Sequence, residues 1–193
     1  MNILSNEDGQ VWLNRHGLCR KKLVALSKAR PDLSLSGFTS VHSLASFVQE
    51  IHTKGFARAP CLMRIDDWGL YQPCELAVME LMRKKLARKN LDLVKYPYHI
   101  VEKDGDSFQA LMGFFCLTYG FKWKATLIFP AGTLAIENWE GEYLDFWSPS
   151  SAIMEYLQEL SAQYGLLCEQ ASKNSTGMRF GAQVSSDGVR TSG

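Results

Sequence analysis

Between Val41 and Val101, apolar residues at helical spacing alternate with short apolar runs typical of strands. This alternation is the strongest structural signal in the sequence. Apolar residues recur at helical spacing from Val41 to Ile51, after the helix-capping residue Ser40 and before Gly55, which can end a helix. The short apolar run Cys61–Ile65 then predicts a strand. An amphipathic helix is therefore expected to lead into a buried strand.

The segment after this strand predicts a turn, a second strand, a helix and a third strand. Asp66-Asp67-Trp68-Gly69 has the composition of a tight turn, and Leu70-Tyr71 begins a second short strand. Pro73 suits the first turn of a helix, where its missing N–H is not needed, and apolar positions carry this helix to about Lys89. Residues 91–101 predict a longer strand. We expect these strands to share one small sheet.

The flanking segments predict further elements. Residues 1–10 predict a loose lead-in, and a first helix is expected from about Leu18 to Ala29. Ser107 can cap a helix over about 107–120, although this segment is apolar all round and a buried strand is the alternative. A last helix is expected after Ser148-Pro149. Before it, an antiparallel meander is expected from Phe121–Phe129, Thr133–Asn138 and Tyr143–Trp147.

Together these elements predict the α+β fold class. The core is a helix-strand-strand-helix-strand unit over 40–102, to which the meander and the C-terminal helix add residues 107–165. The chain has 193 residues and is 46% hydrophobic, enough for a single α/β domain over 1–169 with a sizeable core. Residues 170–193 are rich in Ser, Gly and Thr and are expected to form a disordered tail.

The formal charge of +1 conceals two basic segments. No acidic residue occurs from Gln10 to Pro31, and a second basic run extends from Arg83 to Lys89. Two such patches on a nearly neutral chain favour a polyanion partner such as DNA, although either patch alone fits a solvated helix face equally well. The candidate DNA- or nucleotide-binding residues in these segments are Arg20, Lys21, Lys22, Arg83, Lys84, Lys85, Arg88 and Lys89.

Cysteine usage and hydropathy favour a cytoplasmic protein. The cysteines number five and form no C-x-x-C pair, which favours free thiols in a reducing compartment. The N-terminus lacks the features of a signal peptide, and the longest apolar segment is too short to span a membrane, so we expect no membrane insertion. The four histidines show no metal-ligand spacing, and common nucleotide-binding and hydrolase motifs do not occur.

Part of the chain resembles a known superfamily. The segments LASFVQEIHTKG, CLMRIDDWGLY and PCELAVMEL follow in order the layout of the ParB/sulfiredoxin superfamily, in which a strand-to-helix corner holds a nucleotide or a phosphodiester. The corner here is Gln72-Pro73-Cys74-Glu75. Its glutamate matches that of the family's G-E-R-R motif, whereas Leu76 and Ala77 stand where the arginines would be. The resemblance implies a phosphate site that includes Gln72, with Arg64 or Arg83 supplying the positive charge.

Within this superfamily the chain looks like the Osa-type fertility-inhibition proteins of conjugative plasmids, in its length, its charge and its degenerate corner. That resemblance implies ATP hydrolysis, DNA cleavage and inhibition of conjugative or T-DNA transfer. The candidate cofactors are then ATP and Mg²⁺ or another divalent cation. The implied partners are DNA and a protein of a DNA-transfer system.

Acidic residues near the corner are the candidate catalytic residues and metal ligands. A metal-dependent nuclease needs carboxylates that converge on a hard cation, which polarises the phosphate and activates a water. Asp66 and Asp67 on the expected turn, with Glu75 in the first turn of the helix, are such a set. Two alternatives stay open: Asp66-Asp67 also fits an ordinary turn, and Glu75 also fits a residue that stabilises the helix dipole.

The second half of the sequence is rich in aromatic residues. If they are exposed, their rings could stack on single-stranded bases or anchor a protein partner; if they are buried, they form part of the core.

The leading hypothesis is a plasmid-related, metal-dependent DNase/ATPase that inhibits DNA transfer. The alternatives are a non-enzymatic inhibitor that binds a protein through these aromatics, and a plain DNA-binding module. The aromatics are Trp123, Phe129, Trp139, Tyr143, Phe146 and Trp147.

Overall fold

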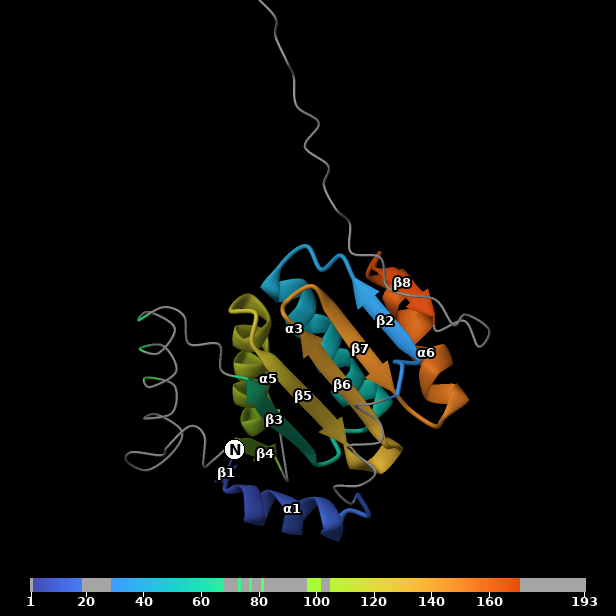
Figure 1. Ribbon diagram of the computed structural model, residues 1–193. Coiled ribbons are helices and arrows are strands. Elements are labelled where there is room, and N and C mark those ends of the chain that lie inside the picture. The colour runs from blue at the N-terminus through green and yellow to red at the C-terminus, as the bar shows by residue number, and fades with distance from the viewer. Residues whose placement is uncertain are drawn as a thin grey trace, which may run out of the picture.

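The computed structural model describes residues 2–18, 29–67, 97–101 and 105–170, together with the single positions Pro73, Ala77 and Leu81. Within them, eight strands form one sheet in the order β1-β4-β3-β5-β6-β7-β2-β8, and all neighbouring strands are antiparallel (Figure 1). The strands are β1 (Asn2–Leu4), β2 (Leu33–Ser36), β3 (Cys61–Asp67), β4 (Tyr98–Val101), β5 (Lys124–Phe129), β6 (Leu134–Trp139), β7 (Tyr143–Trp147) and β8 (Leu167–Gln170). The helical segments are α1 (Asn6–Arg15), α3 (Val41–Glu50), the π-helical turn η1 (Ile51–Gly55), α5 (Gly105–Gly120), the 3₁₀ turn η2 (Pro130–Gly132) and α6 (Ser151–Gln163).

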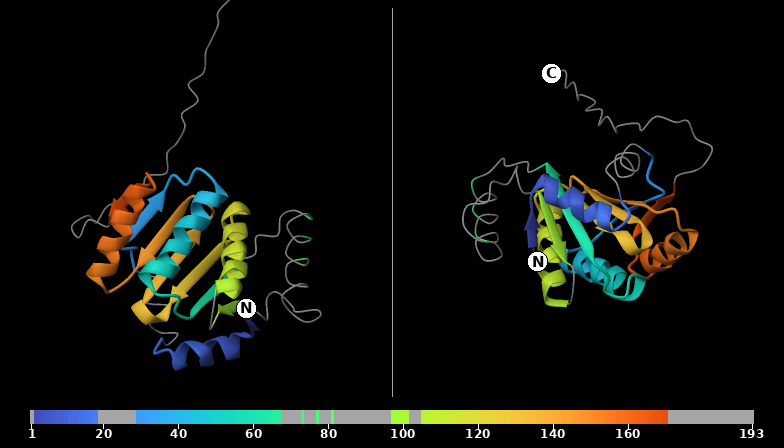
Figure 2. Two further views of the ribbon diagram at one scale, coloured as in Figure 1. Left: turned by 180° about the vertical axis from the view of Figure 1, so that it is seen from behind. Right: turned by 90° about the horizontal axis from the view of Figure 1, so that it is seen from below.

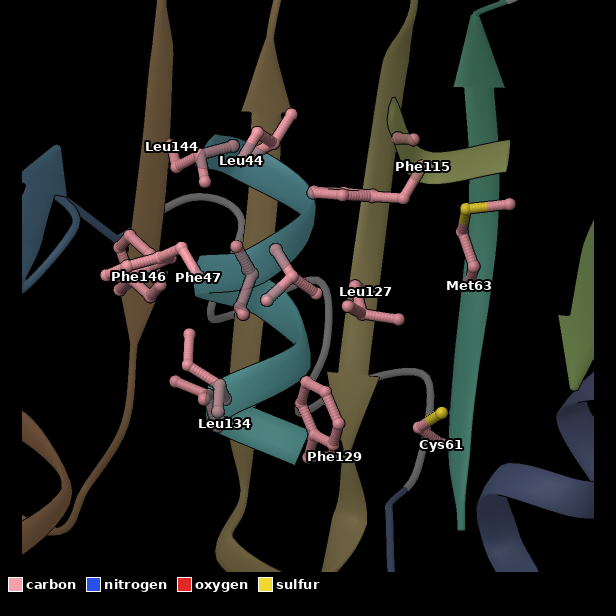
Figure 3. Packing of buried hydrophobic residues seen from close by; sticks show 14 of the residues in the cluster. Leu44, Phe47, Cys61, Met63, Phe115, Leu127, Phe129, Leu134, Leu144 and Phe146 are labelled. Carbon is pink, nitrogen blue, oxygen red and sulfur yellow. The ribbon is translucent and has the colours of Figure 1, made fainter. Parts of the chain in front are cut away.

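Side-chain alternation along the strands divides the sheet into two faces. On one face, residues such as Met63 and Leu127 pack with α3, α5 and α6 in the main hydrophobic cluster (Figures 2 and 3). On the opposite face, Leu62 and Ile128 pack against Trp12 of α1 in a smaller cluster. Neighbouring residues of one strand therefore belong to different layers of the protein.

The predicted helix after Ser40 is confirmed, and its end is refined. The Ser40 hydroxyl oxygen accepts a hydrogen bond from the N–H of Ser43 at 3.1 Å, as a helix N-cap does. At its C-terminal end α3 passes into η1, which reaches Gly55. Gly55 does not adopt the left-handed conformation of a helix stop; a Cβ there would lie 3.1 Å from Cε1 of Tyr156. Close packing against α6 accounts for this glycine.

The N-terminal segment differs from the prediction. Residues expected to form a loose lead-in form β1 and the first half of α1, and the Ser5 hydroxyl oxygen accepts a hydrogen bond from the N–H of Asp8 at 3.1 Å. A Cβ at Gly9 would lie 2.2 Å from Cδ2 of Tyr98, so α1 lies directly against the sheet. Tertiary packing rather than periodicity fixes this helix. The helix expected over about 18–29 falls mostly on residues 19–28, outside the described residues.

The turn predicted at Asp66-Asp67 is wrong, because both residues belong to β3. Asp67 pairs with Lys124 of β5 after an irregularity in the register that follows Ile65. Pairing with a neighbouring strand overrides the local turn preference of the two aspartates. Trp68-Gly69 lies outside the described residues.

The second half agrees closely with the prediction. The apolar segment after Gly105 is the helix α5, which begins slightly before Ser107, and β5, β6 and β7 form the expected meander. The last helix, α6, is confirmed, with Ser150 as its N-cap. The short strands β2 and β8 were not predicted. Every residue of β8 is exposed, so no hydrophobic pattern marks it.

The predicted 40–102 unit is described only in part. Within it β3 and β4 pair in one sheet, and Pro73, Ala77 and Leu81 occupy helical positions. The strand expected at Leu70-Tyr71, the rest of the 73–89 helix and residues 91–96 lie outside the described residues. The α+β fold class is confirmed. None of the described helices combines the length and the apolar character needed to cross a lipid bilayer.

Candidate functional site

A row of polar residues crosses the sheet on the face opposite α3 and α5. Arg64 of β3 stands opposite Thr126 of β5, Thr126 opposite Glu137 of β6, Glu137 opposite Asp145 of β7, and Asp145 opposite Ser34 of β2. Their neighbours along each strand point into the main hydrophobic cluster, so these residues share the other face. Antiparallel pairing thus brings five distant parts of the sequence into one line.

A second row lies two residues further along the same strands, at Asp66, Lys124, Trp139 and Tyr143. Trp139 and Tyr143 stand directly opposite each other in the β6–β7 hairpin. We refer to both rows together as the charged face. It consists of Ser34, Arg64, Asp66, Lys124, Thr126, Glu137, Trp139, Tyr143 and Asp145.

Ion pairs and hydrogen bonds connect the two rows. Arg64 Nη2 lies 2.9 Å from Asp66 Oδ1, and Lys124 Nζ lies 3.1 Å from Glu137 Oε1. The Thr126 hydroxyl lies 3.4 Å from a carboxylate oxygen of both Asp66 and Glu137 and donates to either. Each of these carboxylates therefore has a cationic partner and a neutral donor.

Burial makes these carboxylates costly to ionise. The Glu137 side chain is only 9% exposed, and burial raises its pKa; Lys124 opposes this rise, whereas Asp66 and Asp145 add to it. Burial also raises the pKa of Asp66, against the effect of Arg64 and Lys124. Glu137 and Asp145 are like charges placed directly opposite on adjacent strands, an arrangement that destabilises a sheet. The face therefore favours the approach of additional positive charge.

The aromatic pair is a solvent-exposed apolar part of the charged face. Trp139 is 39% exposed and Tyr143 is 37% exposed. The ammonium of Lys124 lies 4.9 Å from the centroid of the Trp139 ring, a cation–π contact. An exposed tryptophan and tyrosine on neighbouring strands offer a partner a broad contact with little loss of side-chain entropy.

The hairpin that carries this pair is anchored to the core. Buried Asn138 donates from Nδ2 to the carbonyl of Trp123 at 2.9 Å, and its Oδ1 accepts from the N–H of Gly141 at 3.1 Å. Gly141 has a φ of 72°, and a Cβ there would lie 2.4 Å from the carbonyl oxygen of Tyr119. The turn therefore requires glycine, and the contact with the end of α5 holds the aromatic pair in place.

The other aromatics expected near a surface belong to the interior. Trp123, Phe129 and Phe146 are fully buried in the main cluster, which agrees with the core alternative. Trp147 is also buried, and its indole Nε1 donates to the carbonyl of Ala29 at 3.1 Å. The aromatic binding surface anticipated from the sequence is thus reduced to Trp139 and Tyr143.

Of the predicted catalytic and metal-binding residues, only Asp66 has a described side chain. It lies on the charged face, paired with Arg64. Asp67 is described as a strand residue opposite Lys124, and Glu75 lies outside the described residues. Among the described side chains, no group of three or more His, Cys, Asp or Glu residues could hold a metal ion. A metal site formed by Asp66, Asp67 and Glu75 stays a prediction.

Of the predicted nucleotide- or DNA-binding residues, only Arg64 is described. Besides its ion pair with Asp66, its guanidinium carbon lies 5.8 Å from the centroid of the Tyr98 ring. The remaining predicted residues lie outside the described part of the chain: Gln72, Arg20, Lys21, Lys22, Arg83, Lys84, Lys85, Arg88 and Lys89.

The two buried thiols and the histidine in η1 do not resemble reactive groups. Burial raises the pKa of Cys61 to about 12 and that of Cys116 to about 11, which keeps both thiols protonated at neutral pH; Cys168, in contrast, is exposed. His52 stacks on Phe108 with ring centroids 3.6 Å apart, and burial lowers its pKa. It is a neutral, packed histidine.

A small cavity of about 240 Å³ lies between η1 and α6. The one charged residue in its lining is Lys54, which already pairs with Glu50. The cavity therefore lacks the opposed acidic and basic groups of a catalytic site, and the charged face is the stronger candidate.

Comparisons with protein-family models, with curated proteins and with solved structures found no significant match to this chain. Sequence reasoning missed Glu137, Asp145 and Ser34 as members of a site. A signal for the two acids is present: each is a charged residue at the centre of an otherwise largely apolar strand, LAIENW or YLDFW. Burying a charge at such a position costs free energy of folding, so a charged residue there points to a role other than stability.

Proposed function

We propose that the protein acts by binding a protein partner through the charged face, with Trp139 and Tyr143 as the central contacts. The observation that carries this proposal is the exposed aromatic pair on an anchored hairpin, surrounded by partly buried charges. Tryptophan and tyrosine are among the residues that contribute most to protein–protein affinity. A polar rim around such a pair is the usual arrangement at a transient interface.

The resemblance described above supplies the biological setting of the proposal. The protein would be a plasmid-related inhibitor of conjugative or T-DNA transfer, with a ParB/sulfiredoxin-like core, and its partner a protein of the transfer system. Support for such a core comes from the order of α3, β3, the helical position Pro73 and β4, and from the pairing of β3 with β4. These elements follow the order that the superfamily layout implies.

Electrostatics favour a protein over DNA as the partner of this face. Among the described residues of this face, Asp66, Glu137 and Asp145 outnumber Arg64 and Lys124, a net charge of one negative when all five are ionised. DNA-binding surfaces instead owe much of their affinity to lysine and arginine side chains that neutralise phosphates. The charged face therefore fits a protein partner better than DNA.

The second candidate is the metal-dependent nuclease or ATPase. Asp66 favours it, because this partly buried carboxylate lies at the end of β3, where the chain leaves toward the Gln72–Glu75 corner. Binding of Mg²⁺ by Asp66 would free Arg64 to contact a phosphate. The basic run 83–89 would then hold the DNA, which is also how a plain DNA-binding module would work.

A transfer assay with two sets of variants separates the candidates. Trp139→Ala with Tyr143→Ala removes the aromatic pair, and Asp66→Asn with Glu75→Ala removes the expected metal ligands. We expect the first double variant to lose inhibition of plasmid or T-DNA transfer and the second to retain it. Purified wild type should leave supercoiled DNA intact with Mg²⁺ or Mn²⁺. The opposite pattern, with metal-dependent cleavage that Glu75→Ala abolishes, would replace the binding proposal with the nuclease.

A further inference from the structure

We infer that the partner presents a cationic side chain, best an arginine, to the ring of Trp139. This inference rests on the proposed function and names the chemistry of the partner. Its starting point is that the Trp139 ring already interacts with a cation, the ammonium of Lys124 at 4.9 Å. The ring face is therefore placed and oriented to accept positive charge.

The cation now on the ring can be replaced by a better one. Lys124 divides its charge between Trp139 and Glu137, and its side chain is one third exposed. A guanidinium can stack flat on an indole while it donates paired hydrogen bonds to a carboxylate, which an ammonium cannot do. An arginine over Trp139 has Glu137 within the same neighbourhood, since Lys124 contacts both residues at once.

The charge around the aromatic pair is complementary to such a partner. The turn that joins Trp139 to Tyr143 adds Glu140 and Glu142, both exposed, to the acidic excess of the charged face. Exposed Lys122, also near this turn, offsets only part of that charge. The same acids oppose nucleic acid, and they oppose a second copy of the chain that docks the same face by two-fold symmetry. A protein segment with arginine side chains fits both the rings and the charge.

The test uses the full-length protein and short labelled peptides as probes. One peptide alternates arginine and glycine; the matched peptides replace arginine with lysine, glutamate or serine, and oligothymidine represents nucleic acid. Binding is followed by fluorescence anisotropy. We expect the arginine peptide to bind more tightly than the lysine peptide, and the glutamate and serine peptides to bind least. Trp139→Ala should weaken the arginine peptide about two- to fivefold, the range of a cation–π contact.

Replacement of Lys124 gives the sharper result. Lys124→Met removes the competing cation from Trp139 and leaves Glu137 available, so affinity for the arginine peptide should rise about twofold or more. Glu159→Gln, an exposed position on α6, removes one negative charge elsewhere and should change affinity little. Circular dichroism of each variant establishes that it is folded.

Three outcomes would overturn the inference. They are equal binding of the arginine and glutamate peptides, unchanged arginine-peptide binding by Trp139→Ala, and weaker binding by Lys124→Met. Oligothymidine binding that depends on Trp139 would assign the ring to nucleic acid instead. If the Trp139→Ala, Tyr143→Ala variant loses transfer inhibition while the peptides show no charge preference, the charged face is still the binding surface and only the inference of a cationic partner is wrong. If that variant retains inhibition, the proposed function itself fails.

Discussion

The two faces of the sheet are built from the same strands but obey different physical rules. In β5, β6 and β7, alternate residues enter the apolar cluster beneath α3 and α5, and the residues of the charged face lie between them. The helix-covered face gains stability from every side chain that it buries. The charged face holds Glu137 and Asp145 opposite each other, at a cost in desolvation and repulsion.

We interpret this difference as a division between positions that serve stability and positions that serve binding. A fold that needed only stability would place threonine or valine where Glu137 and Asp145 stand. Positions that break local rules without a gain in packing are expected at functional sites. Anchored, exposed aromatics beside those acids complete the contrast with the helix-covered face.

The largest expected effect is on the helix-covered face. Phe47 is fully buried, and its ring lies 5.4 Å from that of Phe38 and 5.3 Å from that of Tyr164. Phe47→Ala should lower the free energy of unfolding by about 3–5 kcal/mol, because it removes apolar contact and leaves a cavity. Urea unfolding followed by circular dichroism measures this loss. A loss below about 1 kcal/mol would mean that the helix-covered face does not hold the fold together.

An intermediate effect should appear as pH dependence on the charged face. Burial raises the pKa of Glu137 above its ordinary value of 4.5, so the folded protein binds this proton more tightly than the unfolded chain. Protonation therefore adds stability: the wild type should gain stability relative to Glu137→Gln as pH falls from neutral through the folded pKa toward 4.5. Urea unfolding of both proteins across this range tests the sign. A difference that is independent of pH would contradict it.

The smallest effect on stability is expected at the exposed ring. Trp139→Ala removes a cross-strand pair with Tyr143 and a cation–π contact, together worth about 1–2 kcal/mol. It also removes a larger side chain than Phe47→Ala does, so the two substitutions form a matched pair for the comparison of faces. If Trp139→Ala destabilised the protein as much as Phe47→Ala, the ring would belong to the core rather than to a binding surface.

The hydrophobic periodicity of the sequence predicted correctly those helices and strands whose apolar residues are the ones buried in the folded protein. Helix α3 and the β5–β6–β7 meander satisfy this condition, since Ser40 caps the helix and apolar residues recur in register with the core. Helix α1 and strand β8 do not satisfy it. The first is fixed by close contact of Gly9 with Tyr98, and the second has no buried residue to mark it.

The candidate site was predictable in its aromatic part and in Arg64 and Asp66, which the sequence had marked as candidates for another chemistry. Tyr143 and Trp139 were recognised as candidate contacts from the density of rings, but sequence alone could not separate them from buried Trp147. Ser34, Glu137 and Asp145 were missed because the row that they form with Arg64 and Thr126 draws on five strands whose register emerges only on folding. Asp66 was assigned to a turn for the same reason: Thr126, which donates a hydrogen bond to its carboxylate, is sixty residues away in the sequence.

The central claim is that the main core lies on the face beneath α3, α5 and α6, and that the charged face binds a partner. Its most direct test is a residue-resolved NMR titration. Full-length ¹⁵N-labelled protein would be titrated with the arginine-glycine peptide while amide shifts are recorded. We predict shift changes that cluster at 64–66, 124–126, 137–139 and 143–145 and leave α3 and α6 unchanged. Changes concentrated on the helices, or no changes at concentrations where the labelled peptide binds, would contradict the account.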